Sequence, residues 1–250
     1  MKKIVVLCIA CISIQAHAQK LIGGDHILKT NLSADALQNF NLTFEKSLNH
    51  FISLSISYAT MPKRSIPFKS LAKNFIDNPN INFDNFKIAN NALTFESRFY
   101  LGLQKMSGFY IAPYARFANL EVNVPVNYTY TTQVGTQNIT VTPPPADLNG
   151  TIRSQSFGAY VGMQFQLLTK LVLDIWVIGG HYGSSNGKLQ FDAPTGTPSQ
   201  ALNALKSSID QTNANPFHLK TTVSGNSVIT DTDGPWAGLR GAGLTVGLRF

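Results

Sequence analysis

Charged side chains are scarce in this sequence of 250 residues, and their scarcity limits the class of protein. Asp, Glu, Lys and Arg make up 13% of the chain, whereas an ordinary soluble domain carries about 25%. A helical membrane protein would explain this deficit only with runs of about 18 or more apolar residues. The longest uncharged apolar stretch is residues 4–14. It is too short for a membrane helix.

Cysteine is nearly absent, since Cys8 and Cys11 are the only two and both lie in that apolar stretch. Lys2 and Lys3 precede the stretch and an Ala-His-Ala sequence at 16–18 follows it, which is the arrangement of a secretory signal peptide. A lipidated Cys11 is the weaker alternative, because Cys8 stands where lipoprotein signals carry a branched aliphatic residue.

We therefore expect residues 1–18 to be a signal peptide and residues 19–250 to be one mature domain. A mature domain without cysteine excludes disulfides, a thiol nucleophile and a Cys metal site. The histidines and acidic residues show no metal-ligand spacing, and no glycine pattern suits a phosphate. We accordingly expect no metal, no cofactor and no catalytic residues. After loss of two lysines, 18 basic residues remain against 13 acidic ones. Because they are scattered, they favour contact with anionic lipid headgroups rather than nucleic acid.

Polar and apolar residues alternate with a period of two, which predicts β-strands. Between residues 52 and 58, aliphatic and aromatic residues alternate with Ser53, Ser55 and Ser57. Comparable runs predict eight strands, near residues 27–32, 39–45, 52–58, 93–101, 109–117, 156–167, 171–177 and 242–250.

Short connections at 47–50, 104–108 and 168–170 alternate with four other connections, at 33–38, 61–90, 130–150 and 185–239. This pattern is typical of a transmembrane β-barrel with short periplasmic turns and long extracellular loops. We therefore predict an all-β, eight-stranded antiparallel barrel in the outer membrane. A secreted lipocalin-like barrel is the alternative, but its outer face would be mostly Ser, Thr, Gly, Gln and Tyr, which suits a soluble surface poorly.

The Lys-Thr-Asn-Leu sequence at 29–32 and the Phe-Tyr-Ile-Ala-Pro-Tyr-Ala-Arg sequence at 109–116 resemble a Bacteroidota barrel group known as DUF3575. The chain also resembles the small eight-stranded barrels of Gram-negative bacteria, such as the barrel domain of outer membrane protein A. The resemblance implies an outer-membrane location and no particular activity. The terminal Phe250, preceded by alternating apolar residues, resembles the signal read by the barrel-insertion machinery.

An eight-stranded barrel has an interior just wide enough for side chains to fill. The polar faces of the strands would place a set of charged residues inside it, and a buried charge needs a partner. The expected lumen charge network consists of Glu45, Glu96, Arg98, Arg116, Asp174 and Arg249, with Lys29 as a further candidate. One interpretation is a plug that stiffens the barrel, and the other is a gated polar path.

His181, Ser184 and Ser185 stand at the top of the seventh predicted strand, where lipid A-modifying barrels place catalytic groups. Asp174 lies on the opposite parity from His181, so the triad geometry is not favoured. We expect His181 to be a residue at the barrel rim that faces headgroups, and we expect the protein not to be an enzyme.

The long connections carry three further features. Lys63, Arg64, Lys69 and Lys73, beside Phe68, Leu71 and Phe75, form a basic amphipathic stretch. A protruding hairpin is expected around 130–150. A helix capped by Thr197, with Pro198 in its first turn, carries a stripe of Ala201, Leu202, Leu205 and Ile209. This stripe either packs on the barrel rim or its own loop, or it docks a partner protein.

The sequence thus predicts a structural or interaction protein that acts through its extracellular loops. Its expected partners are outer-membrane lipids, the insertion machinery, and an extracellular or membrane protein. The alternatives are a narrow channel for small or amphipathic solutes and, third, a lipid A-modifying enzyme.

We expect the mature protein to begin at Gln19 and to fractionate with the outer membrane. A closed barrel has no unpaired strand edge, so it should also resist unfolding in unheated detergent gels. N-terminal mass spectrometry of the fractionated protein checks the first point and gel mobility with and without heating checks the second. Recovery of a soluble periplasmic form would contradict the prediction.

Overall fold

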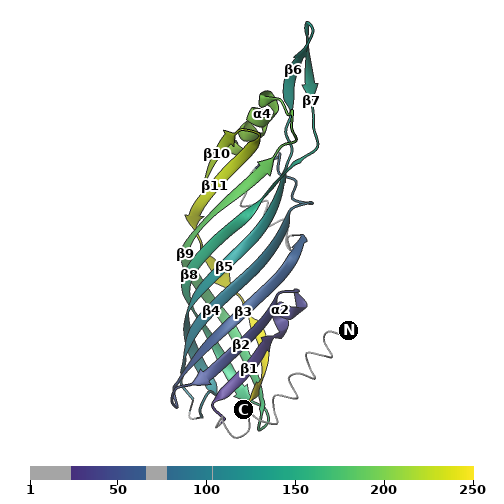
Figure 1. The fold of residues 1–250 in the computed structure, drawn as a ribbon. Coiled ribbons are helices and arrows are strands. Elements are labelled where there is room, and N and C mark those ends of the chain that lie inside the picture. The colour runs from purple at the N-terminus through teal and green to yellow at the C-terminus, as the bar shows by residue number, and fades with distance from the viewer. Residues whose placement is uncertain (1–23, 66–77, 103) are drawn as a thin grey trace, which may run out of the picture.

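The computed structural model describes residues 24–65, 78–102 and 104–250, and strands dominate this part of the chain (Figure 1). Here eight antiparallel strands hydrogen-bond in the order β9-β13-β1-β2-β3-β4-β5-β8, and β8 pairs in turn with β9. A sheet that closes on itself is a β-barrel. Its strands are β1 (His26–Asn31), β2 (Phe40–Ser47), β3 (Ile52–Ser65), β4 (Lys87–Tyr100), β5 (Gly108–Val126), β8 (Ala146–Gln166), β9 (Leu171–Asp192) and β13 (Gly243–Arg249).

All eight predicted strands are present, and the three short turns lie between β2 and β3, β4 and β5, and β8 and β9. The prediction for 1–18 and that for Phe68, Lys69, Leu71, Lys73 and Phe75 concern residues outside the described ranges. β8 begins ten residues before the predicted start, and β9 runs fifteen residues beyond its predicted end. The protruding hairpin expected at 130–150 implied the extension of β8. The extension of β9 was missed because polar residues occupy both parities in the Ser-Ser-Asn-Gly-Lys sequence at 184–188.

The two faces of the barrel wall differ in polarity as the alternation predicts. Leu54 is 44% exposed, whereas the neighbouring Ser55 is 5% exposed. The outward side chains on other strands are also apolar, and they include Leu42, Phe44, Ile56, Phe95, Phe99, Phe109, Ile111, Phe117, Phe157, Phe165, Leu244 and Leu248. The polar side chains point inward, so this barrel is apolar outside and polar inside.

A β-bulge at Val177 changes the parity of β9. Val161 of β8 pairs with Ile178, but the next residue, Gly162, pairs with Trp176. Val177 is therefore the extra residue, and two consecutive side chains, Val177 and Ile178, are exposed at 59% and 57%. Above the bulge the odd-numbered residues of β9 turn inward. Gly179 is among them, and a Cβ there would lie 2.4 Å from the Cβ of Tyr160, so glycine makes room for that tyrosine.

The wall of the barrel is much taller on one side. β5, β8 and β9 have 19, 21 and 22 residues, against six in β1 and seven in β13. Along a single edge, β9 pairs with three strands in succession. These are β13 at the short-turn end, then β12 (Gly238–Arg240), then β11 (Ser227–Pro235), which pairs in turn with β10 (His218–Ser224).

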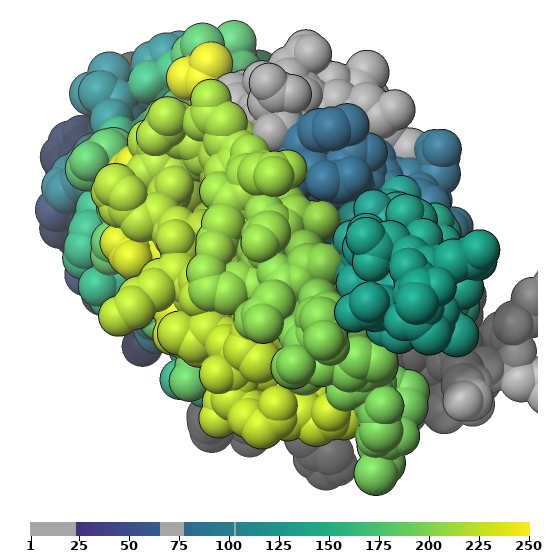
Figure 2. Space-filling view, turned by 90° about the horizontal axis from the view of Figure 1, so that it is seen from above, coloured from purple at the N-terminus to yellow at the C-terminus, as the bar shows by residue number. Residues whose placement is uncertain are grey.

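The long-loop end carries a folded platform, which we define as α4 (Ser199–Asp210), the β10–β11 hairpin and the upper ends of β5, β8 and β9. Seen from above, α4 and the hairpin cover much of this end (Figure 2). The predicted protruding hairpin is also present, as β6 (Tyr130–Val134) paired with β7 (Gln137–Val141). A short helix at the other side of the barrel, α2 (Leu32–Ala36), was not predicted.

The predicted apolar stripe on α4 forms the core of the platform. Its four residues, Ala201, Leu202, Leu205 and Ile209, are buried in one cluster with Val126 of β5, Ala146 and Leu148 of β8, Val228 of β11, and Tyr128 of the segment that follows β5. The first of the two interpretations, packing on the rim or on its own loop, is therefore confirmed, since the cluster includes barrel strands and β11 of that loop. The predicted cap is wrong, because Pro198 occupies the N-cap position and Thr197 donates its hydroxyl to the carbonyl oxygen of Pro194.

Leu205→Ala should loosen the platform without opening the barrel. Leu205 is fully buried in the platform core, and truncating such a leucine costs about 2–5 kcal/mol. We expect faster trypsin cleavage after Lys206, with unchanged heat-modifiable gel mobility. Gln200→Ala, at an exposed position of the same helix, is the control. Equal cleavage rates in both variants would show that this core does not hold α4 in place.

Candidate functional site

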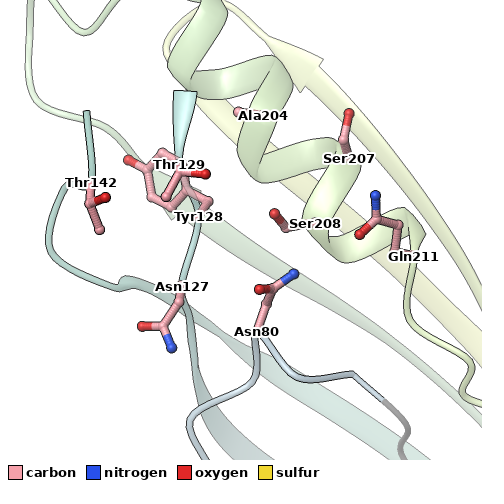
Figure 3. Close-up of a pocket in the computed structure, with 9 residues that line it drawn as sticks. All are labelled: Asn80, Asn127, Tyr128, Thr129, Thr142, Ala204, Ser207, Ser208 and Gln211. Atoms are coloured by element: carbon pink, nitrogen blue, oxygen red, sulfur yellow. The ribbon is translucent and has the colours of Figure 1, made fainter. Parts of the chain in front are cut away.

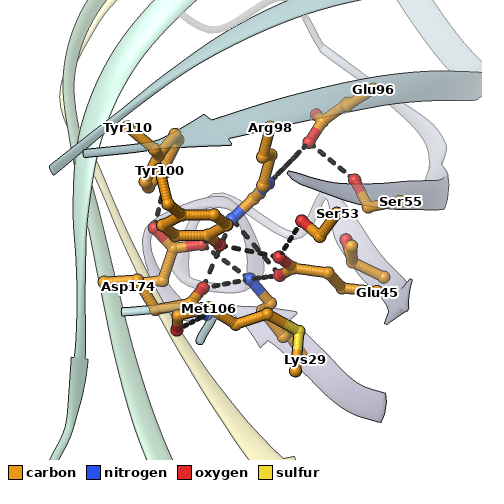
Figure 4. Close-up of polar contacts among 12 residues, drawn as sticks. Lys29, Glu45, Ser53, Ser55, Glu96, Arg98, Tyr100, Met106, Tyr110 and Asp174 are labelled. Carbon is orange, nitrogen blue, oxygen red and sulfur yellow. Dashed lines mark hydrogen bonds and ion pairs between the residues drawn. The ribbon is translucent and has the colours of Figure 1, made fainter. Parts of the chain in front are cut away.

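A cluster of charged side chains crosses the barrel lumen, and Figure 4 shows its contacts. It lies toward the short-turn end, since Glu45 and Arg98 are each two residues from the end of their strands there. Lys29 of β1 lies at its centre and is buried. Its Nζ forms an ion pair with Glu45 of β2, lies 2.9 Å from Oδ2 of Asp174 on β9, and donates a hydrogen bond to Gln164 of β8. One lysine thus joins strands from opposite sides of the ring. This is possible because inward residues of a narrow barrel converge on its axis.

Arg98 of β4 is the second bridging cation. Its Nη1 lies 2.6 Å from Oδ2 of Asp174 and 3.5 Å from Oε2 of Glu45, and its Nη2 lies 3.1 Å from Oε2 of Glu96. Asp174 is therefore shared by Arg98 and Lys29. An arginine suits this position because its planar guanidinium carries several donors in fixed directions.

Hydroxyl groups supply the remaining hydrogen bonds to the carboxylates. Glu45 accepts from Tyr100 at 2.6 Å and from Ser53 at 2.5 Å. Asp174 accepts from Tyr110 at 2.6 Å. Glu96 accepts from Tyr160 at 2.7 Å and from Ser55 at 2.9 Å. Because a buried charge is tolerated only when it is paired and hydrogen-bonded, these hydroxyls are part of what keeps the cluster inside the barrel.

Arg240 forms a second layer above this cluster, and sequence reasoning missed it. It belongs to β12, where the sequence predicted a loop. Its guanidinium carbon lies 4.6 Å from the ring centroid of Tyr160, 4.9 Å from that of Trp176 and 5.4 Å from that of Tyr114. Its Nη1 is 3.5 Å from Oε1 of Glu96. No local signal marks it, because its partners lie on four other strands, β4, β5, β8 and β9.

Within the described residues the ion-paired groups of the lumen balance in charge. Lys29, Arg98 and Arg240 stand against three carboxylates, which are Glu45, Glu96 and Asp174. The structure thus brings together four of the six predicted network residues, Glu45, Glu96, Arg98 and Asp174. It also includes the further candidate Lys29 and adds one unpredicted cation, Arg240.

Arg116 and Arg249 lie apart from this network, which corrects their predicted place in it. Arg116 is near enough to Arg240 for their charges to repel, but in the described part of the chain it forms no ion pair. It lies one inward position above Tyr114, beyond the carboxylates. Arg249 lies at the short-turn end, where it donates to the backbone oxygens of Gly24 and Lys105 and to Gln166.

His181 faces the interior and not the rim, which corrects the prediction. The bulge at Val177 reverses the parity of β9, so the side chain of His181 lies beside Tyr114, with 3.2 Å between Nδ1 and Oη. Ser185 donates to the oxygen of Gly234, and Ser184 accepts from Gln155. Asp174 is held in the ion-pair network. His181, the two serines and Asp174, which were considered as a catalytic triad, are therefore each bonded to other groups.

Two contacts hold the chain ends at the short-turn end. The backbone N–H of Phe250 donates to the oxygen of His26 at 2.9 Å, and the two rings stack. Asp25 pairs with Lys105 of the turn between β4 and β5 at 2.7 Å, and this hydrogen bond lowers the pKa of Asp25. Both ends of the described barrel are thereby fixed to neighbouring strands.

No helix within the described ranges is long and apolar enough to cross a membrane. Over the same ranges, no three histidine, cysteine or acidic side chains gather as metal ligands.

Fold and site together define a closed antiparallel β-barrel whose lumen is bridged by a balanced ion-pair network. The chain belongs to the family described as "Protein of unknown function (DUF3575)", whose model matches residues 4–201. No curated protein matches the chain.

Two solved structures from Acinetobacter baumannii are similar to it. The crystal structure of CarO is 10% identical, with a TM-score of 0.37, and the match covers 92% of this chain and 99% of CarO. The crystal structure of CarO2 is 10% identical, with a TM-score of 0.36, and the match covers 90% of this chain and 97% of CarO2. The barrel architecture described above follows from the strand pairing of this chain itself.

Lys29→Met should destabilise the barrel strongly, because Glu45 and Asp174 would lose their shared cation. Breaking a buried ion pair by removing one partner costs about 3–5 kcal/mol. We expect the refolded variant to unfold at a lower urea midpoint than the wild type, with unfolding monitored by heat-modifiable gel mobility. Lys188→Met is the matched control, since its ion pair with Asp231 is 3.6 Å long and well exposed and should contribute little. Equal losses in the two variants would contradict a structural role for the lumen network.

Proposed function

We propose that this protein is an outer-membrane β-barrel that does not conduct solutes and that presents the platform outside the cell as a binding surface. The observation that carries the proposal is the polarity of the barrel wall, which is the reverse of that in a soluble barrel. Apolar side chains form its outer surface, while its lumen holds the ion-paired charges.

The outer face supports a membrane location. Large apolar side chains such as Leu54, Phe95, Ile111 and Phe157 are 44–66% exposed, and comparable side chains occur on the other strands of the ring. Soluble proteins rarely expose continuous apolar surface of this extent. A membrane barrel needs such a belt, and all its backbone groups are paired between strands.

The short-turn end would face the periplasm and the long-loop end the outside. Outer-membrane barrels place short turns in the periplasm and long loops outside. With this orientation, residues 1–18 serve as the export signal and Phe250 as the insertion signal. The expected partners are the surrounding lipids, the insertion machinery, and a ligand or protein at the platform. We further propose a Gram-negative source among the Bacteroidota and an architecture akin to the barrel domain of outer membrane protein A.

The contacts that fill the lumen support a plugged barrel rather than a channel. Lys29, Arg98 and Asp174 connect strands across the ring, and Tyr110 and Tyr160 fill the space beside them. A narrow channel for small solutes would require several buried ion pairs to break together, and each broken pair leaves an uncompensated charge. A lipid A-modifying activity is not supported either, because His181 and the nearby serines bond to other groups.

Planar-bilayer recordings test the closed lumen. We expect the wild-type barrel to insert without conductance steps, with insertion verified independently by flotation with liposomes. The double variant Arg98→Ala/Tyr160→Ala removes two side chains that cross the lumen, and it should show small steps. Regular single-channel steps from the inserted wild-type protein would contradict the plug and favour the channel.

A further inference from the structure

The platform contains an open pocket of about 400 Å³ between three segments of the chain (Figure 3). One wall is the segment around Asn80, the second is the base of the β6–β7 hairpin, and the third is α4. Its lining residues are Asn80, Asn127, Tyr128, Thr129, Thr142, Ala204, Ser207, Ser208 and Gln211. The volume falls within the range of small-molecule sites, which is about 300–1,000 Å³.

The spacing of residues along α4 explains how one helix packs on the platform core and also lines the pocket. While Leu202, Leu205 and Ile209 face the platform core, the adjacent face carries Ala204, Ser207, Ser208 and, just beyond the helix, Gln211. Residues three and four apart share one face of a helix. The helix therefore presents a small polar face to the pocket while its apolar face fixes its position.

Hydrogen bonds hold the segment around Asn80 in place. Asn78 is buried, and its Nδ2 donates to the oxygen of Ser208 at 2.8 Å and to the hydroxyl of Thr212 at 2.6 Å. On the other side, the N–H of Asn127 donates to the oxygen of Asn80 at 2.7 Å. These bonds join the three walls, so the pocket is formed before any ligand arrives.

The lining is polar but carries no charge. It offers three amides and four hydroxyls of serine and threonine, and in the described part of the chain the side chains of Asn80, Ser207 and Gln211 form no hydrogen bond. The nearest charges on α4, Lys206 and Asp210, pair with each other. Burial raises the pKa of Tyr128, so its phenol stays neutral at physiological pH.

This chemistry selects among classes of ligand. An anionic ligand calls for arginine or lysine, and a metal ion calls for carboxylates or histidines. An apolar ligand calls for a mostly hydrophobic lining. Amides and hydroxyls both donate and accept hydrogen bonds, as sugar hydroxyls do. We propose that this pocket binds an uncharged carbohydrate.

The inference rests on the proposed function in one respect, which is that the platform faces the outside. There the pocket would meet surface polysaccharides or soluble sugars. The binding itself does not depend on orientation, so it is measured on purified protein and the orientation is measured on cells.

The folded, full-length mature protein in detergent is applied to an array of neutral hexose and N-acetylhexosamine oligosaccharides, with sialylated and sulfated forms of the same chains. We expect binding to neutral chains, and at least tenfold weaker binding for Asn80→Ala and Gln211→Ala. Asn138→Ala and Gln133→Ala, at exposed positions of the β6–β7 hairpin, are the matched controls and should bind as the wild type. Ser207→Trp should abolish binding by filling the pocket.

Three outcomes overturn the inference, namely no binding to any neutral chain, a preference for charged chains, and binding unchanged in the pocket variants. Heat-modifiable gel mobility verifies that each variant is folded. Separately, an epitope inserted at Gly225, in the turn between β10 and β11, is stained on intact cells. Absence of staining there would contradict the proposed orientation and leave the measured binding as it stands. Competition by free monosaccharide distinguishes recognition of a single sugar unit from recognition of a polysaccharide chain.

Discussion

The pairing of Asp174 with two cations is the interaction on which the rest of this barrel depends. Lys29 reaches Asp174 from β1 and Arg98 reaches it from β4, so one carboxylate joins three strands across the lumen. Polar strand faces can point inward only if such groups neutralise one another there. Once they do, the alternation of each strand places apolar side chains on the outer surface. The ion pairs in the lumen thus determine which face of the wall is polar and which is apolar.

Much of the fold follows from the sequence, because a period of two survives wherever a strand has one polar and one apolar face. The seven residues from Ile52 to Tyr58 alternate without exception, and the structure buries their serines. The prediction for β9 stopped short where the wall rises into the platform, since polar residues occupy both parities at 184–188. It also missed the bulge at Val177, because an inserted residue between two apolar neighbours leaves no mark in composition. Because this inserted residue reverses the parity of β9, the predicted outward position of His181 is wrong.

The site was predictable in part for the same reason. Glu45, Glu96, Arg98 and Asp174 each interrupt an otherwise neutral polar face, so parity alone places them inside. Arg240 gave no such signal, since its position depends on the pairing of β12 with β9 and on rings from Tyr114, Tyr160 and Trp176. Arg249 has the correct parity but lies at the strand end, where it bonds to Gly24, Lys105 and Gln166 and not to the lumen carboxylates. The pocket was invisible to sequence reasoning, because its walls come together only in three dimensions.

The shared edge of β9 has a consequence for how the chain reaches its native state. β13 pairs both with β9 and with β1, which precedes it by more than 200 residues, so ring closure is the most non-local step of folding. β11 and β12 precede β13 in the chain, and they pair with the same edge of β9 farther along. The pairing of the platform hairpin and the closure of the ring are therefore both arranged along one strand, β9.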